Sequence, residues 1–128
     1  MRDEILEKTK QWLNKAERDI EAGEILLERG IYDYSLFHAQ QAIEKFLKAF
    51  LTYHNMPFGK THNVKKLVRL CMEIDEEFEY VNEAGAGELY PKSIEVRYPT
   101  SYEPKEEEAR EAIDIAKKVR EFVLRKID

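Results

Sequence analysis

The stretch YSLFHAQQAIEKFLKAFLT, residues 34–52, decides the fold, because its apolar side chains recur at the spacing of an α-helix. At about 100° per residue, one side of this helix must be buried, and it consists of Leu36, Ala39, Ile43, Phe46, Leu47 and Phe50. The opposite side, here named the polar stripe, consists of Tyr34, His38, Gln41, Lys45, Lys48 and Thr52. The polar stripe faces away from the core and contains no acid, although acids outnumber bases in the chain. This pattern indicates an anionic or hydrogen-bonding partner.

Length and composition indicate one folded domain over residues 1–128. Hydrophobic residues make up 43% of the chain, which is enough for a core, and charged residues make up 37%. An average globular protein has about 25% charged residues. The excess, mostly Glu, Lys and Arg, predicts a solvated helical surface and a thermophilic source.

Three features predict a cytoplasmic protein without membrane association. Cys71 is the only cysteine, so no intramolecular disulfide can form, which fits a reducing cytosol. No stretch approaches the ~20 apolar residues of a membrane span. The N-terminus begins with the charged residues Arg2, Asp3 and Glu4 and has no apolar signal-peptide run.

Charge is unevenly distributed along the chain. The net charge is −5, which argues against a general polyanion binder, yet six bases and no acid lie between Lys45 and Arg69 inclusive. A local positive stretch on an acidic chain suits a small phosphate-bearing ligand, a short RNA or an acidic protein surface. A dimer contact neutralised by acids of the partner subunit is an equally good interpretation.

Helical patterns extend along most of the chain. From Ile5 to Leu27 apolar residues recur every seven positions, and Gly30 stands where a left-handed residue ends a helix. Small residues in this first helix allow a neighbouring helix to approach closely: Thr9, Ala16 and Gly23. Asp33 is the predicted N-cap of the second helix, which runs to Tyr53. The short link makes the two helices antiparallel.

The second half of the chain predicts two or three further helices. A third helix starts near Asn63, with Thr61 or Asn63 as its cap, and Asp75 can cap a short fourth one. Residues 90–104 are expected to be irregular, and Pro104 suits the first turn of a last helix. The buried face of that helix consists of Ala109, Ala112, Ile113, Ala116, Val119, Val123 and Ile127. The sequence therefore predicts an all-α, up-and-down antiparallel bundle of four to five helices.

The usual catalytic motifs are missing from the sequence. There is no Walker loop, no pair of histidines at metal spacing and no nucleophile elbow. The segment Gly85-Ala86-Gly87 is too short for dinucleotide binding. We predict no metal site, no cofactor and no catalytic residue.

Four groups of residues, each weak by itself, combine into a more specific pattern. They are QQAIEKFLKA (residues 40–49), Thr61-His62, Arg97-Tyr98-Pro99 and, in the first helix, Ala16, Asp19 and Ala22 ahead of Leu26-Leu27 and Gly30-Ile31-Tyr32. In this order and spacing the chain resembles the HEPN family of helical bundles. The resemblance implies a homodimer that often acts beside a minimal nucleotidyltransferase in a toxin–antitoxin pair. It also implies RNA cleavage through an Arg-x4-6-His motif.

The chain departs from that RNase motif. The eligible positions after Arg97 hold Tyr102, Glu103 and Pro104, and all three histidines precede Arg97. Arg97 can stabilise phosphate charge, but the expected general acid or base is missing. Tyr102 is a poor substitute, because an unperturbed tyrosine has a pKa of about 10. We therefore predict a homodimer that binds nucleotide or RNA phosphate, or a nucleotidyltransferase partner. An atypical metal-independent RNase and a purely structural dimerisation module are the alternatives.

The predicted binding residues are Gln41, Glu44, Lys45, Lys48, His62, Arg97 and Tyr98. Ordinary structural roles compete with this interpretation. Glu44 and Lys48 have the spacing of a helix ion pair. His38 suits a surface or interface hydrogen bond, and Arg97 can fix its loop to Glu44 or to another acid.

Overall fold

The computed structural model describes residues 2–100 and 102–127; Ser101, within the segment predicted to be irregular, lies outside them. The described part contains six α-helices, one 3₁₀ helix and no strand. In order these are α1 (Arg2–Glu28), α2 (Tyr32–Tyr53), α3 (Val64–Ile74), η1 (Glu76–Phe78), α4 (Glu79–Glu83), α5 (Ala86–Glu95) and α6 (Glu106–Ile127). The predicted all-α bundle is confirmed, with one helix more than expected.

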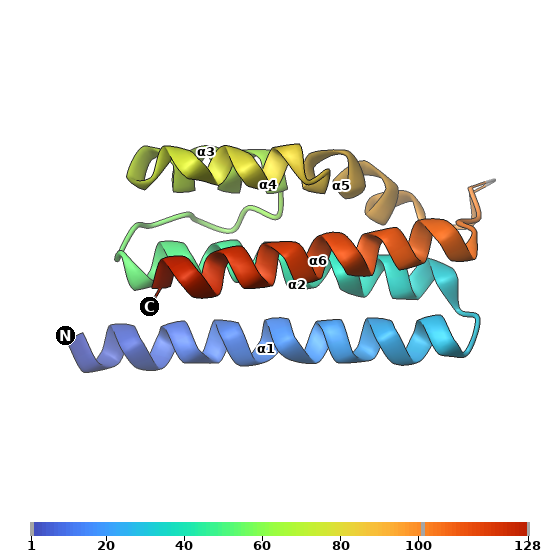
Figure 1. Cartoon of the computed structure of the whole chain (residues 1–128), viewed down its shortest axis with the longest axis horizontal. Coiled ribbons are helices and arrows are strands. Elements are labelled where there is room, and N and C mark those ends of the chain that lie inside the picture. The colour runs from blue at the N-terminus through green and yellow to red at the C-terminus, as the bar shows by residue number, and fades with distance from the viewer. Residues whose placement is uncertain (1, 101, 128) are drawn as a thin grey trace.

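Helix α2 lies at the centre of the bundle, because it packs against α1, α6, α3 and α5. Figure 1 shows α1 on one side of α2 and α6, and a layer of α3, α4 and α5 on the other side. The helices α1 and α2 are antiparallel, as the short link between them predicts (Figure 1).

The apolar side of α2 forms the middle of the core. Its six predicted members, Leu36, Ala39, Ile43, Phe46, Leu47 and Phe50, are all at most 1% exposed. The ring centroid of Phe78 in η1 lies 4.2 Å from that of Phe50 and 4.9 Å from that of Phe122. These aromatic contacts join α2, η1 and α6 into one core.

Several polar side chains of α2 are buried as well, and one of them, Lys48, belongs to the polar stripe. Gln40 is 1%, Glu44 2% and Lys48 5% exposed. The expectation that the polar stripe faces away from the core is therefore wrong for Lys48, which is buried. The physical reason is the central position of α2, which is packed against α1 on one flank and against α3 and α5 on another. At its start, Tyr34 is exposed.

The contact between α1, α2 and α6 depends on the predicted small residues. Thr9, Ala16 and Gly23 are all buried. A Cβ atom on Gly23 would lie 2.7 Å from Cδ1 of Ile113 in α6, and Ser35 donates a 2.7 Å hydrogen bond to the Gly23 carbonyl. Gly30 has a φ of +79° and ends α1 as predicted, with the amide of Ile31 donating to the carbonyl of Leu26.

Two predicted boundaries are wrong. Helix α2 begins at Tyr32, so Asp33 lies in its first turn, where its carboxylate accepts a hydrogen bond from the amide of Tyr34. Helix α5 occupies part of the segment expected to be irregular, and it contains Pro91. Gly85, with a φ of +102°, makes the turn from which α5 starts. Pro91 is the sixth of the ten residues of α5, so it lies inside the helix and cannot donate the backbone hydrogen bond that another residue would make there.

Other helix starts agree with the predicted capping residues. The side chain of Asn63 accepts from the amide of Lys66, and that of Asp75 accepts from the amide of Glu77, so Asp75 caps η1. Pro104 lies two residues before α6 rather than in its first turn.

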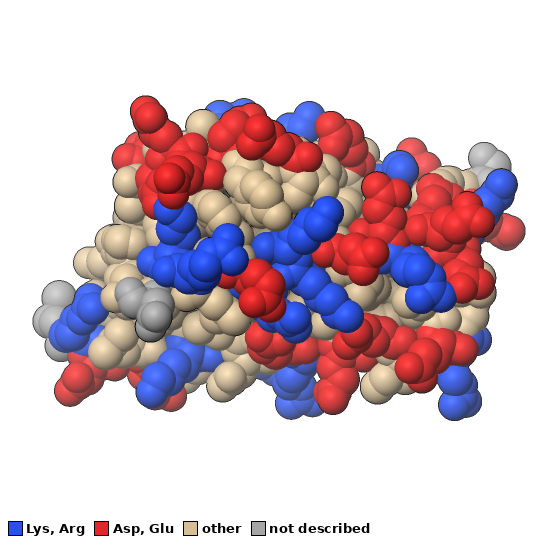
Figure 2. Space-filling view, in the orientation of Figure 1, with Lys and Arg blue, Asp and Glu red and all other residues tan. Residues whose placement is uncertain are grey.

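Figure 2 shows basic and acidic side chains interspersed over one face of the molecule. Ion pairs also join α6 to other elements. Lys117 pairs with Glu24, Arg120 with Glu17 and Lys126 with Asp75. None of the helices described is both long and apolar enough to span a membrane.

Candidate functional site

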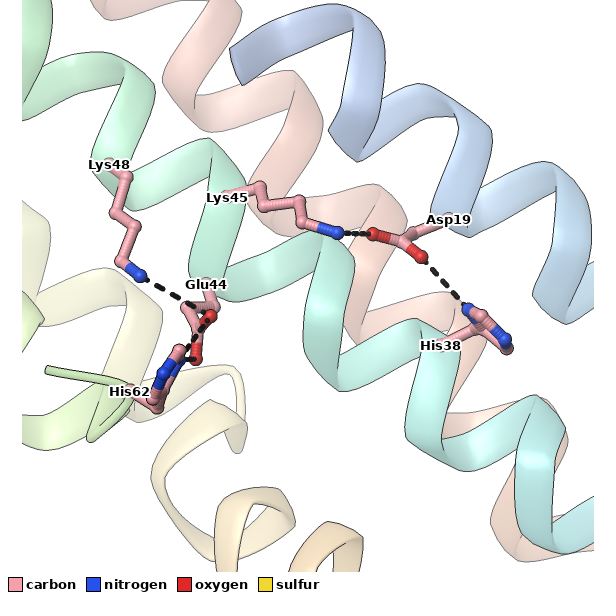
Figure 3. A network of polar contacts seen from close by, with 6 residues as sticks. All are labelled: Asp19, His38, Glu44, Lys45, Lys48 and His62. Atoms are coloured by element: carbon pink, nitrogen blue, oxygen red, sulfur yellow. Dashed lines mark hydrogen bonds and ion pairs between the residues drawn. The ribbon is translucent and has the colours of Figure 1, made fainter. Parts of the chain in front are cut away.

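Two clusters of a carboxylate, a histidine and a lysine lie along α2 (Figure 3). In the first, named the Asp19 cluster, Asp19 of α1 is 8% exposed. His38 donates from Nδ1 to its carboxylate at 2.8 Å, and Nζ of Lys45 donates to the other carboxylate oxygen. Burial disfavours the charged carboxylate, but the hydrogen bonds and charges of His38 and Lys45 outweigh it and lower the pKa of Asp19.

The second cluster, named the Glu44 cluster, joins α2 to the segment before α3. Nδ1 of His62 lies 3.1 and 3.2 Å from the two carboxylate oxygens of Glu44, and Nζ of Lys48 lies 3.4 Å from one of them. The side chain of Lys48 is only 6% exposed, and its ammonium lies 5.4 and 5.6 Å from the ring centroids of Trp12 and Phe58. Lys48 is therefore held inside the protein by Glu44 and by two aromatic rings.

A pocket of about 220 Å³, named the α2–α5 pocket, lies beside the Glu44 cluster. Helix α2 lines it with Phe37, Gln40, Gln41 and Glu44. Helix α5 contributes Tyr90 and Ser93, while His62 and Arg97 come from the segments that flank α3 and α5. The imidazole of His62 is 69% exposed, and its Nε2 is left for a further hydrogen bond because Nδ1 is bonded to Glu44.

Arg97 brings a positive charge to this pocket. Its guanidinium carbon lies 5.5 Å from the ring centroid of Phe37 and 6.0 Å from that of Tyr98. No acidic side chain of the described residues forms a salt bridge with Arg97, so the interpretation that Arg97 fixes its loop to Glu44 or another acid is wrong. The donors of the guanidinium are free to bind an anion.

The predicted binding residues divide into three groups. Gln41, Glu44, His62 and Arg97 line the α2–α5 pocket, and Lys48 bonds to Glu44 in its wall. Lys45 belongs to the Asp19 cluster. Tyr98 is 61% exposed and lines a separate hollow with Tyr102.

Four further residues line the pocket and are not among the predicted binding residues: Phe37, Gln40, Tyr90 and Ser93. The signal for Gln40 was its position four residues before Glu44, which places both on one flank of α2. Tyr90 and Ser93 belong to α5, a helix that the sequence did not predict because it contains a proline and glycines.

Tyr102, the poor substitute for the missing histidine of the RNase motif, does not share a pocket with Arg97. The hydroxyl of Tyr102 donates a 2.9 Å hydrogen bond to Glu108. Burial and this bond raise the pKa of Tyr102, so its deprotonated form, which could act as a base, is even less populated at neutral pH than that of a free tyrosine.

Fold and pocket define an all-α bundle with a polar pocket on one flank of its central helix. The family model of the HEPN domain matches residues 9–127, and the chain belongs to the HEPN family. The resemblance seen in the sequence is thereby confirmed.

Two solved structures have a similar fold. The crystal structure of TT1696 from Thermus thermophilus has a TM-score of 0.77 and 28% identity, covering 93% of this chain and 98% of that one. The crystal structure of ST0689, an archaeal HEPN homologue, has a TM-score of 0.73 at 24% identity and covers 94% of this chain and 98% of that one. At that identity the second likeness concerns the fold alone.

A shorter match connects the chain with a curated protein of Methanocaldococcus jannaschii, named "Putative toxin MJ1304". The two are 35% identical over 51 residues, which is 40% of this chain and 34% of that protein. The match thus spans about a third of the length of the curated relative.

Proposed function

We propose that the α2–α5 pocket binds the phosphate of a nucleotide or of RNA, with Arg97 and His62 as the phosphate-binding residues. The observation that carries this proposal is the pairing of an exposed histidine with an arginine that has no acidic partner among the described residues, in one pocket. The charge of Glu44 is balanced by Lys48, so Arg97 gives the pocket a positive charge, and protonation of His62 adds a second.

The proposed binding is tested by calorimetric titration with AMP, ribose 5-phosphate and a short RNA. Arg97→Ala and His62→Ala should each weaken binding about tenfold or more, because each removes charge-assisted hydrogen bonds. Arg110→Ala is the matched control, since Arg110 on α6 pairs with Glu106 outside the pocket. Unchanged affinity in both pocket variants, with folding intact, would overturn the proposal.

The proposed assembly is a homodimer that acts beside a minimal nucleotidyltransferase. Support for both partners comes from membership of the HEPN family. Light scattering measures the mass of the purified protein, and co-purification with the product of an adjacent nucleotidyltransferase gene tests the pairing. A monomeric mass at micromolar concentration would contradict the homodimer.

RNA cleavage without a metal is the second candidate, because His62 and Arg97 line one pocket and Glu44 holds Nδ1 of His62. Nε2 of His62 would take the proton of a ribose 2′-hydroxyl, and the 2′-oxygen would bond to phosphorus. The bond from phosphorus to the 5′-oxygen would break, and that oxygen would take a proton from the imidazolium. Arg97 would stabilise the phosphorane charge. The products are a 2′,3′-cyclic phosphate and a 5′-hydroxyl.

A fluorescent RNA oligonucleotide tests this second candidate. His62→Gln and Arg97→Ala should abolish cleavage, while Tyr102→Phe should leave it unchanged. Cleavage that persists in both pocket variants identifies a contaminating nuclease. A protein that neither binds nor cuts would be the structural dimerisation module.

A further inference from the structure

The amide of Gln40 is buried in the wall of the α2–α5 pocket without a hydrogen-bond partner. Gln40 is 1% exposed, and neither Nε2 nor Oε1 is bonded to any described residue. One other buried side-chain atom in the described residues lacks a partner, Oδ1 of Asn82, but Nδ2 of that amide bonds to Glu79. An unpaired buried amide costs free energy, so a hydrogen-bonding partner for Gln40 would have to come from a bound molecule.

The shape of the pocket limits what this ligand can be. A volume of about 220 Å³ is below the ~300–1,000 Å³ of sites for drug-sized molecules, but it is several times the ~30 Å³ that one water occupies. The walls include the rings of Phe37 and Tyr90, and the guanidinium of Arg97 lies over Phe37. Aromatic rings and a guanidinium plane suit a single flat ring system.

The chemistry of the amide narrows the ligand further. Gln40 presents a donating NH2 group and an accepting oxygen side by side, so both groups gain a partner from a ligand that offers an acceptor next to a donor. Carboxylates and fully ionised phosphate monoesters offer acceptors only and would leave Oε1 unpaired. Adenine offers N7 beside its 6-amino group, an arrangement that glutamine recognises with two hydrogen bonds.

We propose that Gln40 reads the base of the bound ligand and that the ligand is an adenine nucleotide, with its base against Gln40 and its phosphate at Arg97 and His62. This inference rests on the proposed phosphate-binding function, and Gln40 adds the selectivity for the base. The two phosphate-binding groups, Arg97 and His62, stand at the exposed side of the pocket and the neutral amide of Gln40 in its buried wall, which matches the charged and neutral ends of a nucleotide.

Titration with three ligands separates the base from the phosphate. The wild-type protein should bind AMP at least about tenfold more tightly than IMP or ribose 5-phosphate, because IMP replaces the 6-amino donor with an acceptor and ribose 5-phosphate has no base. Gln40→Met keeps the size of the side chain and removes the amide. It should bind AMP and IMP with equal affinity and be at least as stable as the wild type, because no polar group stays unpaired.

A second measurement needs no variant. The side-chain amide resonance of Gln40 in a nitrogen-15 spectrum should shift when AMP is added and stay in place when ribose 5-phosphate is added. Equal binding of AMP and IMP by the wild type would overturn the base-reading role and leave the phosphate site standing, whereas no binding of any of the three ligands would overturn both. A preference for AMP over IMP that survives in Gln40→Met, or a Gln40 resonance that AMP does not shift, would also overturn the inference.

Discussion

His62 and Glu44 are bonded across the boundary between solvent and core: the imidazole is 69% exposed, the carboxylate side chain only 3%, and they are 3.1 Å apart. A buried carboxylate that fixes one nitrogen of an exposed histidine sets the orientation of the ring and keeps the other nitrogen available. The same carboxylate neutralises the buried ammonium of Lys48. Glu44 therefore orients His62 in the pocket and neutralises Lys48 in the core.

Glu44→Gln should destabilise the protein strongly. The change leaves Lys48 as a buried cation without its counter-ion, and breaking a buried pair in this way costs about 3 kcal/mol or more. Urea unfolding at pH 7 measures the loss.

Two further variants make this prediction decisive. The double variant Glu44→Gln, Lys48→Met should regain much of the lost stability, because it leaves no unpaired charge and methionine packs well between Trp12 and Phe58. Glu24→Gln, which breaks the exposed pair with Lys117, should cost less than about 1 kcal/mol. A loss below that control value in the single variant Glu44→Gln would contradict the buried pair.

The Asp19 cluster should make stability depend on pH. The pKa of Asp19 in the folded protein lies below its ordinary value of 3.8, so the ionised carboxylate stabilises the folded state. This stabilisation is fully present above pH 4 and is lost as the pH falls through the lowered pKa. Asp19→Asn should therefore be less stable than the wild type by about 2 kcal/mol at pH 7, and the difference should shrink towards pH 2. Unfolding curves at pH 7, 5 and 3 measure it, and a difference that stays constant would refute the linkage.

Gly23→Ala tests the close contact between α1 and α6. Alanine favours a helix by ~1 kcal/mol over glycine, but its Cβ would lie 2.7 Å from Cδ1 of the buried Ile113 and 3.3 Å from the carbonyl oxygen of Ser35. We expect a net loss of about 1 kcal/mol, since overpacking a core typically costs ~1–3 kcal/mol. Thermal unfolding measures the change. In an Ile113→Val background, which removes Cδ1, the same substitution should be neutral or stabilising; an equal loss in both backgrounds would contradict the clash.

The parts of the fold that follow from local chemistry were predictable from the sequence. Periodicity alone identified the buried side of α2, and the left-handed preference of glycine identified Gly30 as the end of α1. Helix α5 escaped because Gly85, Gly87 and Pro91 all lower helix propensity, while its burial against α2 and α3 compensates. In α5, tertiary packing outweighs low helix propensity.

The polar clusters were not predictable, because they depend on the register between helices. Nothing in the spacing of α1 places Asp19 opposite His38 and Lys45, which lie 19 and 26 residues away in sequence. The lack of acids on the polar stripe predicted an anionic or hydrogen-bonding partner, whereas the group that Lys45 contacts is Asp19, an acid of the same chain. The unpaired state of Gln40 is equally a property of its neighbours in space.

Arg97→Lys tests whether phosphate binding needs the geometry of the guanidinium or only its positive charge. Lysine keeps the charge, but it lacks the planar fork of donors and cannot stack on Phe37 as the guanidinium does. We expect Arg97→Lys to lose about tenfold in AMP affinity, close to the loss in Arg97→Ala, with the unfolding midpoint unchanged because the side chain is exposed. Calorimetric titration at two salt concentrations measures both affinity and its screening. If Arg97→Lys bound AMP like the wild type, a point charge would suffice, and the stacked geometry over Phe37 would have no part in recognition.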